Sequence, residues 1–228
     1  MKVSLCFFVW NELPGCKLDI PNIDLNQFDE VFAVDAGSTD GTVEYLESFN
    51  IPVHTQPRRG YNQAYIFAFD ICSTDALIFY HPKGTIPPQH IGHFIPYLKE
   101  GYDLVIGSRI GSLARNEEDD KVIRHRKWFV LFLAYISAIL WRKNGSFIKD
   151  VLHGFRAMRK DSFLRLNLLE DGMTADLEMV VGSYKRQYKV IEFPTQEEKC
   201  VYRNSHFKAI PTGIRMLSFL RRELCKND

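Results

Sequence analysis

Short apolar runs alternate with longer amphipathic stretches through the first half of the chain. Five runs rich in β-branched and aromatic residues have the length of buried strands: residues 2–9 (KVSLCFFV), 30–35 (EVFAVD), 51–55 (IPVHT), 76–80 (ALIFY) and 103–108 (DLVIGS). The segments between them are long enough for crossover helices, which is typical of a mostly parallel sheet flanked by helices on both faces. The pattern predicts an α/β fold, and the 228 residues fit one domain.

The second half of the chain is more helical. Residues 128–141 (WFVLFLAYISAILW) carry no charge and have basic flanks, but a membrane-spanning helix needs about twenty residues. The run predicts either a helix on a membrane surface or a buried helix whose basic ends reach water. Residues 174–194 predict an amphipathic helix followed by a strand, and residues 213–225 predict a basic amphipathic helix, also suited to a membrane surface. The charged stretch 115–121 (RNEEDDK) predicts a solvated loop.

Charge and cysteine content narrow the setting of the protein. The 29 basic and 28 acidic residues almost cancel, so bulk charge gives no support for a nucleic-acid partner. The five cysteines are odd in number and scattered, which fits neither a disulfide framework nor a zinc site. The apolar start of the chain reaches Asn11 and Glu12 too soon to be a signal core. We expect a cytoplasmic protein, at the inner face of a membrane if the two helices bind there.

A polar turn, residues 35–42 (DAGSTDGT), follows the second apolar run. In α/β sheets, ligands bind beyond the carboxyl ends of the strands. Gly37 and Gly41 allow a tight turn, and the Asp35 carboxylate could accept a hydrogen bond from a nucleobase or a ribose hydroxyl. The alternative is a plain capped turn between a strand and a helix.

Seven motifs occur in an order and at intervals that resemble the family 2 glycosyltransferases. They extend over nearly the whole chain: VWNE (9–12), VDAGSTDGT (34–42), RRGYNQA (58–64), STDALIFYHPKGTIPP (73–88), DLVIGSR (103–109), KDVLHGFRAMRK (149–160) and ADLE with VIEFP (175–194). Within the family the chain is most similar to the dolichyl- or polyprenyl-phosphate sugar synthases, because GSR, GFRA and a C-terminal YRNSHFK segment (202–208) occur together.

The resemblance implies a GT-A fold, a nucleotide-diphosphate-sugar donor and inversion at the anomeric carbon of the sugar. It also implies donor contacts from Asn11, Glu12, Asp35, Gly37, Asp75, His81 and Arg109. Asp35 would bind the base or ribose, Asp75 would lie near the base, and Arg109 would support the phosphates or the acceptor pocket. Gly154, Phe155 and Arg156 would line the acceptor side, with Asp150 as a catalytic carboxylate just before them.

The chain departs from the family at residues His81-Pro82-Lys83, the HPK turn. The family has a D-x-D pair there, which holds a divalent cation against the diphosphate of the donor. Magnesium prefers carboxylate oxygens, so we expect no metal at this turn. The exchange changes the local formal charge from minus two to plus one, and Lys83 could replace the cation. There are two alternatives. In the first, the enzyme uses an altered donor, or Mg or Mn is held by other carboxylates. In the second, the chain binds its ligand without turnover.

Asp176 and Glu178 lie where many relatives in this family keep the carboxylate that deprotonates an acceptor hydroxyl. Residues two apart on a helix point in different directions, so only one of them can face the site. We expect Asp176 to be the general base and Glu178 to belong to the acceptor side. The alternative for either is a capping or surface carboxylate.

A lipid-phosphate acceptor would need cations more than a base, because a phosphate monoester is already anionic at pH 7. The sequence offers Arg156, Arg203 and Lys208 to hold it. A sugar-hydroxyl acceptor would instead depend on Asp176.

We therefore expect an inverting hexosyltransferase of polysaccharide biosynthesis that moves a sugar from a nucleotide sugar to a polyprenyl phosphate or a cell-surface glycan. Residues 1–110 would bind the nucleotide sugar and residues 111–228 the acceptor, without a metal and in peripheral contact with a membrane. The alternative is a non-catalytic, membrane-associated nucleotide-sugar-binding protein. Turnover of a donor separates the two.

Overall fold

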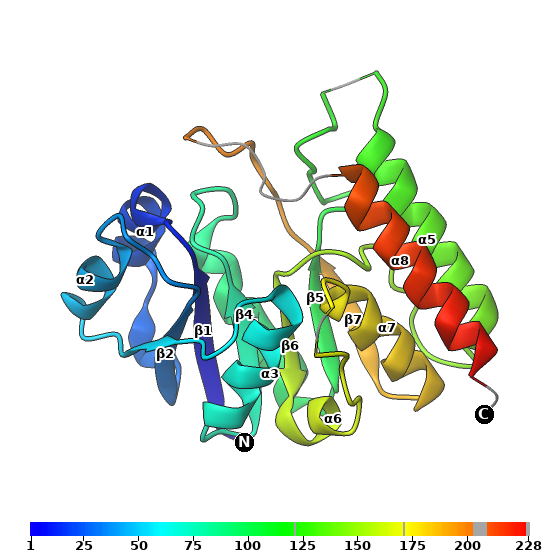
Figure 1. Cartoon of the computed structure of the whole chain (residues 1–228), viewed down its shortest axis with the longest axis horizontal. Coiled ribbons are helices and arrows are strands. Elements are labelled where there is room, and N and C mark those ends of the chain that lie inside the picture. The colour runs from blue at the N-terminus through cyan, green and yellow to red at the C-terminus, as the bar shows by residue number, and fades with distance from the viewer. Residues whose placement is uncertain (121, 171, 203–208, 227–228) are drawn as a thin grey trace.

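A computed structural model describes the chain except for residues 121, 171, 203–208 and 227–228. Its centre is a seven-stranded sheet in the order β3-β2-β1-β4-β6-β5-β7 (Figure 1). The strands are β1 (Val3–Val9), β2 (Glu30–Asp35), β3 (Val53–Thr55), β4 (Ala76–Tyr80), β5 (Leu104–Ser108), β6 (Arg156–Arg159) and β7 (Val190–Pro194). Only β6 among them pairs antiparallel with its neighbours. The predicted α/β fold with a mostly parallel sheet is confirmed, and all five strands predicted in the first half form.

Helices cover both faces of the sheet, because side chains on both faces of the strands are apolar and buried. All seven residues of β1 are buried, with Phe8 in the core on the α3 face and Phe7 in the core on the opposite face. The helices are α1 (Leu13–Asp19), α2 (Thr42–Glu47), α3 (Tyr61–Ile71), α4 (Phe94–Lys99), α5 (His125–Trp141), α6 (Lys160–Leu164), α7 (Ala175–Lys185) and α8 (Ala209–Cys225), with short 3-10 turns η1 (Ile20–Asn22), η2 (Leu25–Gln27) and η3 (Pro88–His93).

The two helices expected at a membrane surface, α5 and α8, lie side by side at one end of the molecule (Figure 1). They are in contact, because a Cβ on Gly213 would touch the Phe129 ring at 3.4 Å. Through the described parts of the chain, none of the helices combines the length and the apolar character needed to cross a membrane.

The charged stretch before α5 is not simply solvated. Glu118 is only 5% exposed, and its carboxylate accepts the backbone N–H groups of Arg126 and Lys127 at 3.1 and 3.2 Å. These N–H groups belong to the first turn of α5, where a carboxylate also complements the helix dipole. The expectation of a solvated loop is wrong for this residue, which caps α5.

The direction of a strand decides which loop reaches the functional edge of the sheet. The six parallel strands end at one edge, here called the carboxyl edge, and because β6 runs the other way, the residues that precede it also lie there. Asp75 precedes the parallel strand β4 and therefore lies at the opposite edge, where its carboxylate accepts the backbone N–H of Lys2 at 2.7 Å. The prediction that Asp75 lies near the donor base is wrong for this reason.

Candidate active site

The turn after β2 holds its own aspartate. The Asp35 carboxylate accepts the backbone N–H groups of Gly37 and Ser38 at 2.8 and 3.0 Å and the Ser38 hydroxyl at 2.5 Å. Asn11, in a left-handed conformation with φ 53°, accepts the backbone N–H of Thr39 at 2.8 Å. The structure thus brings Asn11, Asp35 and Gly37 together at the carboxyl edge. The Asp35 carboxylate is engaged within its turn, and its contact with a donor stays a prediction.

The HPK turn packs directly against α1. A Cβ on Gly15 would overlap the carbonyl oxygen of Pro82 and the hydroxyl of Tyr202. That hydroxyl donates to the buried carboxylate of Glu12 at 2.7 Å. The absence of a side chain at Gly15 therefore lets α1, the HPK turn and Tyr202 meet at one point beside the predicted donor residue Glu12.

Tyr202 is carried there by residues 195–202, the crossing segment, which leaves β7 and runs over the carboxyl edge toward α1 (Figure 1). The segment is fixed on the way by backbone hydrogen bonds. The N–H of Arg115 donates to the Thr195 carbonyl at 3.0 Å, and the N–H of Glu198 donates to the Thr85 carbonyl at 2.7 Å. The end of β7 and the HPK turn are thus tied together.

His81 lies on the other side of the HPK turn, toward β6. A Cβ on Gly154 would be 2.9 Å from Cε1 of His81 and 3.0 Å from the Tyr61 hydroxyl. The His81 ring lies 6.4 Å from the Tyr61 ring, nearly parallel to it, and 5.6 Å from the Phe8 ring, edge-on. Gly154 therefore leaves space for an imidazole and a phenol at the carboxyl end of β4.

The Tyr61 hydroxyl connects this point to Asp176. It donates to Oδ2 of Asp176 at 2.7 Å, while the Tyr65 hydroxyl donates to Oδ1 at 3.0 Å. Burial and the Asp176 carboxylate raise the pKa of both tyrosines well above the ordinary value, so both remain protonated donors. Nε of Arg156 lies 3.1 Å from Oδ1 of the same carboxylate. Asp176 is thus brought near His81, but its oxygens already face three donors.

Arg156 does not face an acceptor. It is 0% exposed, and its guanidinium donates to the carbonyl oxygens of Val151, His153 and Asp176 at distances from 2.6 to 3.4 Å. It lies on β6, an inner strand of the sheet, and its guanidinium reaches the start of α7. The prediction that Arg156 binds the acceptor is wrong, because its donors are used to hold the loop before β6 and the start of α7.

Glu178 is also structural. Its carboxylate accepts the Asn62 amide and the backbone N–H of Leu169, both at 2.9 Å, and the Thr174 hydroxyl. It thereby joins the start of α7 to α3. These contacts do not support an acceptor role for Glu178, and that only one of the two carboxylates faces the site stays a prediction, although Asp176 and Glu178 have separate partners.

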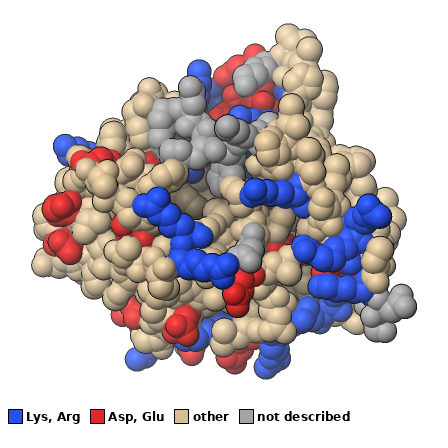
Figure 2. All heavy atoms as spheres, viewed as in Figure 1, with Lys and Arg blue, Asp and Glu red and all other residues tan. Residues whose placement is uncertain are grey.

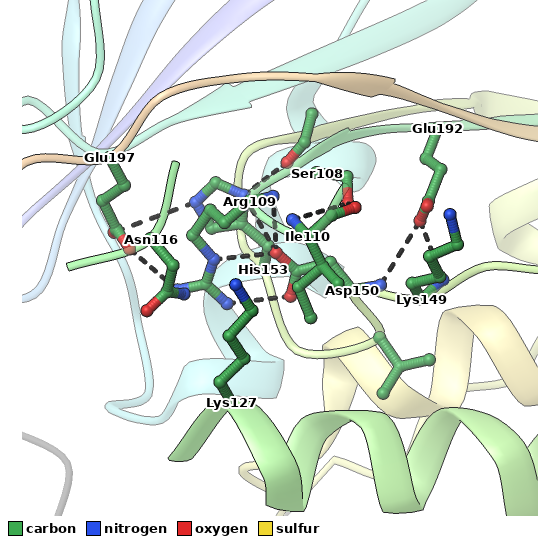
Figure 3. Close-up of polar contacts among 12 residues, drawn as sticks. Ser108, Arg109, Ile110, Asn116, Lys127, Lys149, Asp150, His153, Glu192 and Glu197 are labelled. Atoms are coloured by element: carbon green, nitrogen blue, oxygen red, sulfur yellow. Dashed lines mark hydrogen bonds and ion pairs between the residues drawn. The ribbon is translucent and has the colours of Figure 1, made fainter. Parts of the chain in front are cut away.

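Arg109, Asp150 and Glu197 form a second group at the carboxyl edge (Figure 3). Nε and Nη2 of Arg109 each donate to one oxygen of Asp150 at 2.8 Å, and Nη1 donates to Glu197 at 3.0 Å. The side chain of Asp150 is 0% exposed. Arg109 lowers the pKa of both carboxyl groups below their ordinary values despite their burial. Arg109 and Asp150 neutralise each other in a bidentate pair, and the predicted catalytic role of Asp150 and donor role of Arg109 stay predictions.

His153 completes this group. Its Nδ1 lies within hydrogen-bond distance, 2.5 Å, of the Gly107 carbonyl oxygen, which fits an Nδ1–H donor, and its Nε2 lies 3.9 Å from Glu197. Burial and the nearby Arg109 lower its pKa below 6.5, so the ring is neutral near pH 7. His153 is a core histidine, and the group as a whole attaches Glu197 of the crossing segment to β5.

Several residues of the site were not predicted from the sequence, and two residues that were predicted lie outside the described part of the chain. Tyr61 and Tyr65 are spaced i, i+4 and so share one face of α3, a signal that could have placed them together. No local pattern pointed to Glu197. Arg203 and Lys208, predicted to bind the acceptor, fall within the undescribed residues 203–208.

Basic side chains gather around this part of the surface. Figure 2 shows a hollow near the middle of the face that Figure 1 presents, above the carboxyl ends of β1 and β4, with Lys and Arg side chains on two sides of it. A Cβ on Gly37 would lie 2.7 Å from Nη2 of Arg59, so this arginine reaches from the loop before α3 to the turn after β2. An anionic ligand in the hollow would meet positive charge.

The residues at the end of β4 do not fit a magnesium or manganese site. They present an imidazole and an ammonium rather than carboxylate oxygens. Across the described residues there is no group of three His, Cys, Asp or Glu side chains placed to hold a metal ion. Metal independence stays a prediction.

The sequence matches the profile of Glycosyl transferase family 2 over residues 16–166. The chain belongs to this family. The match includes the turn after β2, the HPK turn and β6, and it ends before α7.

Two curated relatives cover most of this family 2 chain. It is 31% identical over 175 residues to "Glycosyltransferase AglJ" of Haloferax volcanii, an alignment that covers 74% of this chain and 54% of the relative. It is 29% identical over 205 residues to the "Dolichol-phosphate mannosyltransferase" of Pyrococcus furiosus, covering 85% and 56%. The chain thus spans about half the length of these relatives.

Solved structures show the fold. The complex of glucosyl-3-phosphoglycerate synthase from Mycobacterium tuberculosis with Mn2+, UDP and glucosyl-3-phosphoglycerate matches with a TM-score of 0.70 at 16% identity, over 100% of this chain and 81% of that one. The same enzyme with Mn2+ and UDP-glucose matches with a TM-score of 0.71 at 17% identity, over 100% and 80%. The predicted GT-A fold is confirmed.

Proposed function

We propose that this family 2 chain transfers a sugar, with inversion, from a nucleotide-sugar donor to an acceptor, and that Lys83 supplies the positive charge that relatives obtain from a metal. One observation carries the proposal. The HPK turn touches α1 beside Glu12 on one side, while His81 touches Gly154 and Tyr61 on the other. The turn therefore stands between the predicted donor half and the predicted acceptor half.

The chemistry asked of Lys83 is electrostatic. The departing nucleoside diphosphate gains negative charge as the glycosidic bond breaks, and a fixed cation beside it stabilises the transition state. An ammonium does this as a point charge and needs no carboxylates around it. Arg59, which lies against the turn after β2, is a second cation on the donor side.

A polyprenyl phosphate is the acceptor that the geometry favours. A sugar hydroxyl needs a base with a free oxygen, yet Asp176 already accepts two tyrosine hydroxyls and contacts Arg156. A phosphate oxygen is anionic at pH 7 and attacks without prior deprotonation. The name of the Pyrococcus furiosus relative points to the same class of acceptor for that protein.

The surface of α5 and α8 suits attachment to a membrane. Four apolar side chains at i, i+4, i+7 and i+11 form an exposed stripe along α5: Trp128, Phe132, Tyr135 and Ile139, each at least 49% exposed. A similar stripe on α8 contains Ile210, Ile214, Leu217 and Leu224, each at least 43% exposed. Aromatic and aliphatic side chains with basic residues nearby are typical of helices that lie in the interface of an anionic bilayer. We propose on this basis that the protein acts at the inner face of a membrane.

Binding of the donor tests the role of Lys83. Titration calorimetry with UDP-, GDP-, dTDP- and CMP-sugars in EDTA should show one donor that binds, and Lys83→Ala should weaken it tenfold or more. Lys17→Ala removes an exposed lysine on α1 and should change nothing. Binding that requires added magnesium or manganese would overturn the proposal for Lys83.

Vesicle binding tests the helix surface. Wild-type protein should sediment with vesicles that contain anionic lipid, and Ile139→Ser should reduce the bound fraction severalfold. Leu113→Ser is the control, because Leu113 is 77% exposed and lies outside both helices. Equal loss for both variants, or no binding by the wild type, would contradict attachment through α5 and α8.

A non-catalytic nucleotide-sugar-binding protein is the second candidate. It is favoured by the lack of a free base at Asp176 and by the exchange of the acidic pair for His81 and Lys83. Purified protein given the donor that it binds and a polyprenyl phosphate should release the nucleoside diphosphate if it is an enzyme. Tight binding with no release over a wide range of acceptors would favour the second candidate.

A further inference from the structure

Asp19 is a buried carboxylate at the C-terminal end of α1. It is the last residue of this helix and is 3% exposed. A negative charge at this end of a helix opposes the helix dipole. None of the ion pairs formed among the described residues includes Asp19, although burial of a carboxylate without a cation partner is unfavourable. Neither the stability of α1 nor a charge pair therefore explains its position.

The backbone of the HPK turn supplies the hydrogen bonds that this carboxylate accepts. The N–H of Gly84, the residue after the turn, donates to Oδ2 of Asp19 at 2.9 Å. Burial raises the pKa of Asp19, and the backbone N–H groups of Gly84 and Lys83 oppose that rise because they stabilise the charged form. The carboxylate and the turn therefore depend on each other, since these N–H groups would lose their acceptor without Asp19.

The HPK turn lies against one face of α1. Gly15, Leu18 and Asp19 are spaced i, i+3 and i+4, so they share that face. A Cβ on Gly15 would lie 2.8 Å from Cα of Lys83, and a Cβ on Gly84 would lie 2.6 Å from Cδ1 of Leu18. Gly84 also has φ 64°, a left-handed conformation that glycine adopts without strain. The Cα of Lys83 is thus fixed by contacts with α1 on both sides of it.

The position of this Cα matters because the lysine side chain is flexible. Its ammonium is a point charge at the end of a four-carbon stem. Such a charge stabilises a departing diphosphate best when it needs no reorganisation at the moment of reaction. The stem imposes few constraints of its own, so the backbone of the turn sets the region that the ammonium can reach. A residue that fixes this backbone therefore affects how well Lys83 meets the donor.

We propose that Asp19 is a positioning residue, which holds the backbone of the HPK turn so that Lys83 meets the diphosphate of the donor without prior rearrangement. The inference rests on the role of Lys83 proposed above. Asp19 does not itself touch the donor, because it is buried and its carboxylate faces the backbone of the turn. Its effect on donor binding therefore passes through Lys83.

A double-mutant cycle tests this dependence. The probe is the tightest binder among UDP-glucose, GDP-mannose and dTDP-glucose, titrated calorimetrically into the full chain in EDTA. Asp19→Ala should weaken its binding about tenfold in the wild-type background, because a displaced cation loses its effect, but less than about twofold in the Lys83→Ala background. Asp19→Asn keeps an acceptor oxygen for the Gly84 N–H and should weaken binding less than about threefold.

Asp29→Ala is the matched control. The Asp29 carboxylate also accepts a backbone N–H, that of Val3 at 2.8 Å, but it does so at the opposite edge of the sheet. This variant should bind the donor as the wild type does. Thermal unfolding would show whether each variant is folded. If Asp19→Ala does not fold, Gly84→Ala takes its place, because its methyl group strains the left-handed backbone and displaces the same turn, so its effect should also depend on Lys83.

The outcomes separate this inference from the proposed function. If the wild type binds none of the three nucleotide sugars, or if Lys83→Ala binds its donor as tightly as the wild type, the proposed role of Lys83 fails and the inference fails with it. If Lys83→Ala weakens binding but Asp19→Ala has no effect, or has an equal effect in both backgrounds, the inference alone is overturned. Equal losses for Asp19→Ala and Asp19→Asn would also overturn it, because the hydrogen bond from Gly84 would then not be the contact that matters.

Discussion

Two groups of polar side chains lie at the carboxyl edge of this sheet, and they differ in composition: aromatic rings and hydroxyls dominate the first, and charges paired with one another dominate the second. In the first group, His81 and Tyr61 surround Gly154 and reach Asp176. In the second group, Arg109, Asp150 and Glu197 bind one another in the interior. Position beyond a strand end is therefore not sufficient to make a charged residue catalytic. A charge that is already paired holds loops in place.

The largest loss of stability is expected when one partner is removed from the second group. Asp150→Asn leaves the Arg109 guanidinium without one of its two carboxylates, and breaking a buried pair costs about 3–5 kcal/mol of unfolding free energy. Urea unfolding measures it. Asp70→Asn, an exposed carboxylate on α3, should change stability by less than about 0.5 kcal/mol. Equal effects of the two variants would mean that the buried pair contributes no more than a surface charge.

The same group should make stability depend on pH in two steps. The pKa of His153 is lowered below 6.5 by folding, so below pH 6.5 the unfolded chain binds a proton first and stability falls. Asp150 and Glu197 have lowered pKa values, so their stabilisation is complete above about pH 4.5 and is lost as the pH falls further. Each proton contributes a slope of up to about 1.4 kcal/mol per pH unit.

Urea midpoints between pH 8 and pH 3 would show both steps. His153→Gln should remove the first step and leave the second. A wild type and a His153→Gln variant with parallel pH curves would exclude His153 as the source of the first step.

Substitutions in the first group should lower the catalytic rate more than the stability of the fold. Tyr61→Phe removes the hydroxyl that joins Asp176 to the point beside His81, and we expect kcat to fall about 10- to 100-fold because the groups that this hydroxyl positions are displaced. Tyr65→Phe is the matched control. It removes a hydrogen bond to the same carboxylate from a residue with 0% exposure, so it should cost about 1 kcal/mol of stability without changing kcat. Equal falls in kcat for both would assign the effect to Asp176 alone.

The smallest effect is expected at Gly154, which follows His153 of the second group and touches the first. Gly154→Ala places a methyl group 2.9 Å from His81 and 3.0 Å from the Tyr61 hydroxyl. The His81 ring must shift by a few tenths of an ångström, and we expect kcat to fall about tenfold, the scale at which displaced catalytic groups lose rate. Stability should change little because the ring is only half-buried. Steady-state kinetics with the donor that calorimetry identifies would measure it.

The sequence predicted the strands well because five apolar runs have strand length and lie between longer polar segments. It predicted the donor edge less well, because the rule that ligands lie after strands holds only when the direction of each strand is known. Asp75 precedes a parallel strand and lies at the wrong edge, while Gly154 precedes the antiparallel strand and lies at the right one. No local pattern encodes that β6 is inserted antiparallel between β4 and β5.

The roles of individual charges were harder to predict for a related reason. Arg109 and Arg156 were expected to bind ligands, and both are paired inside the protein with carboxylates that come from distant parts of the chain. Which carboxylate meets which arginine depends on tertiary packing. The HPK turn was recognised from a motif, and its neighbours Tyr202 and Gly154 became visible only in three dimensions.

Gly15 has a consequence for how the protein tolerates change. Backbone from the HPK turn and the Tyr202 side chain occupy the space that any side chain at Gly15 would need. In a library that contains every substitution, this position should be depleted of all other residues, alanine included, whereas the exposed neighbours Pro14 and Lys17 should vary freely. Intolerance of substitution at Gly15 would therefore identify the point at which segments separated by most of the chain must fit together.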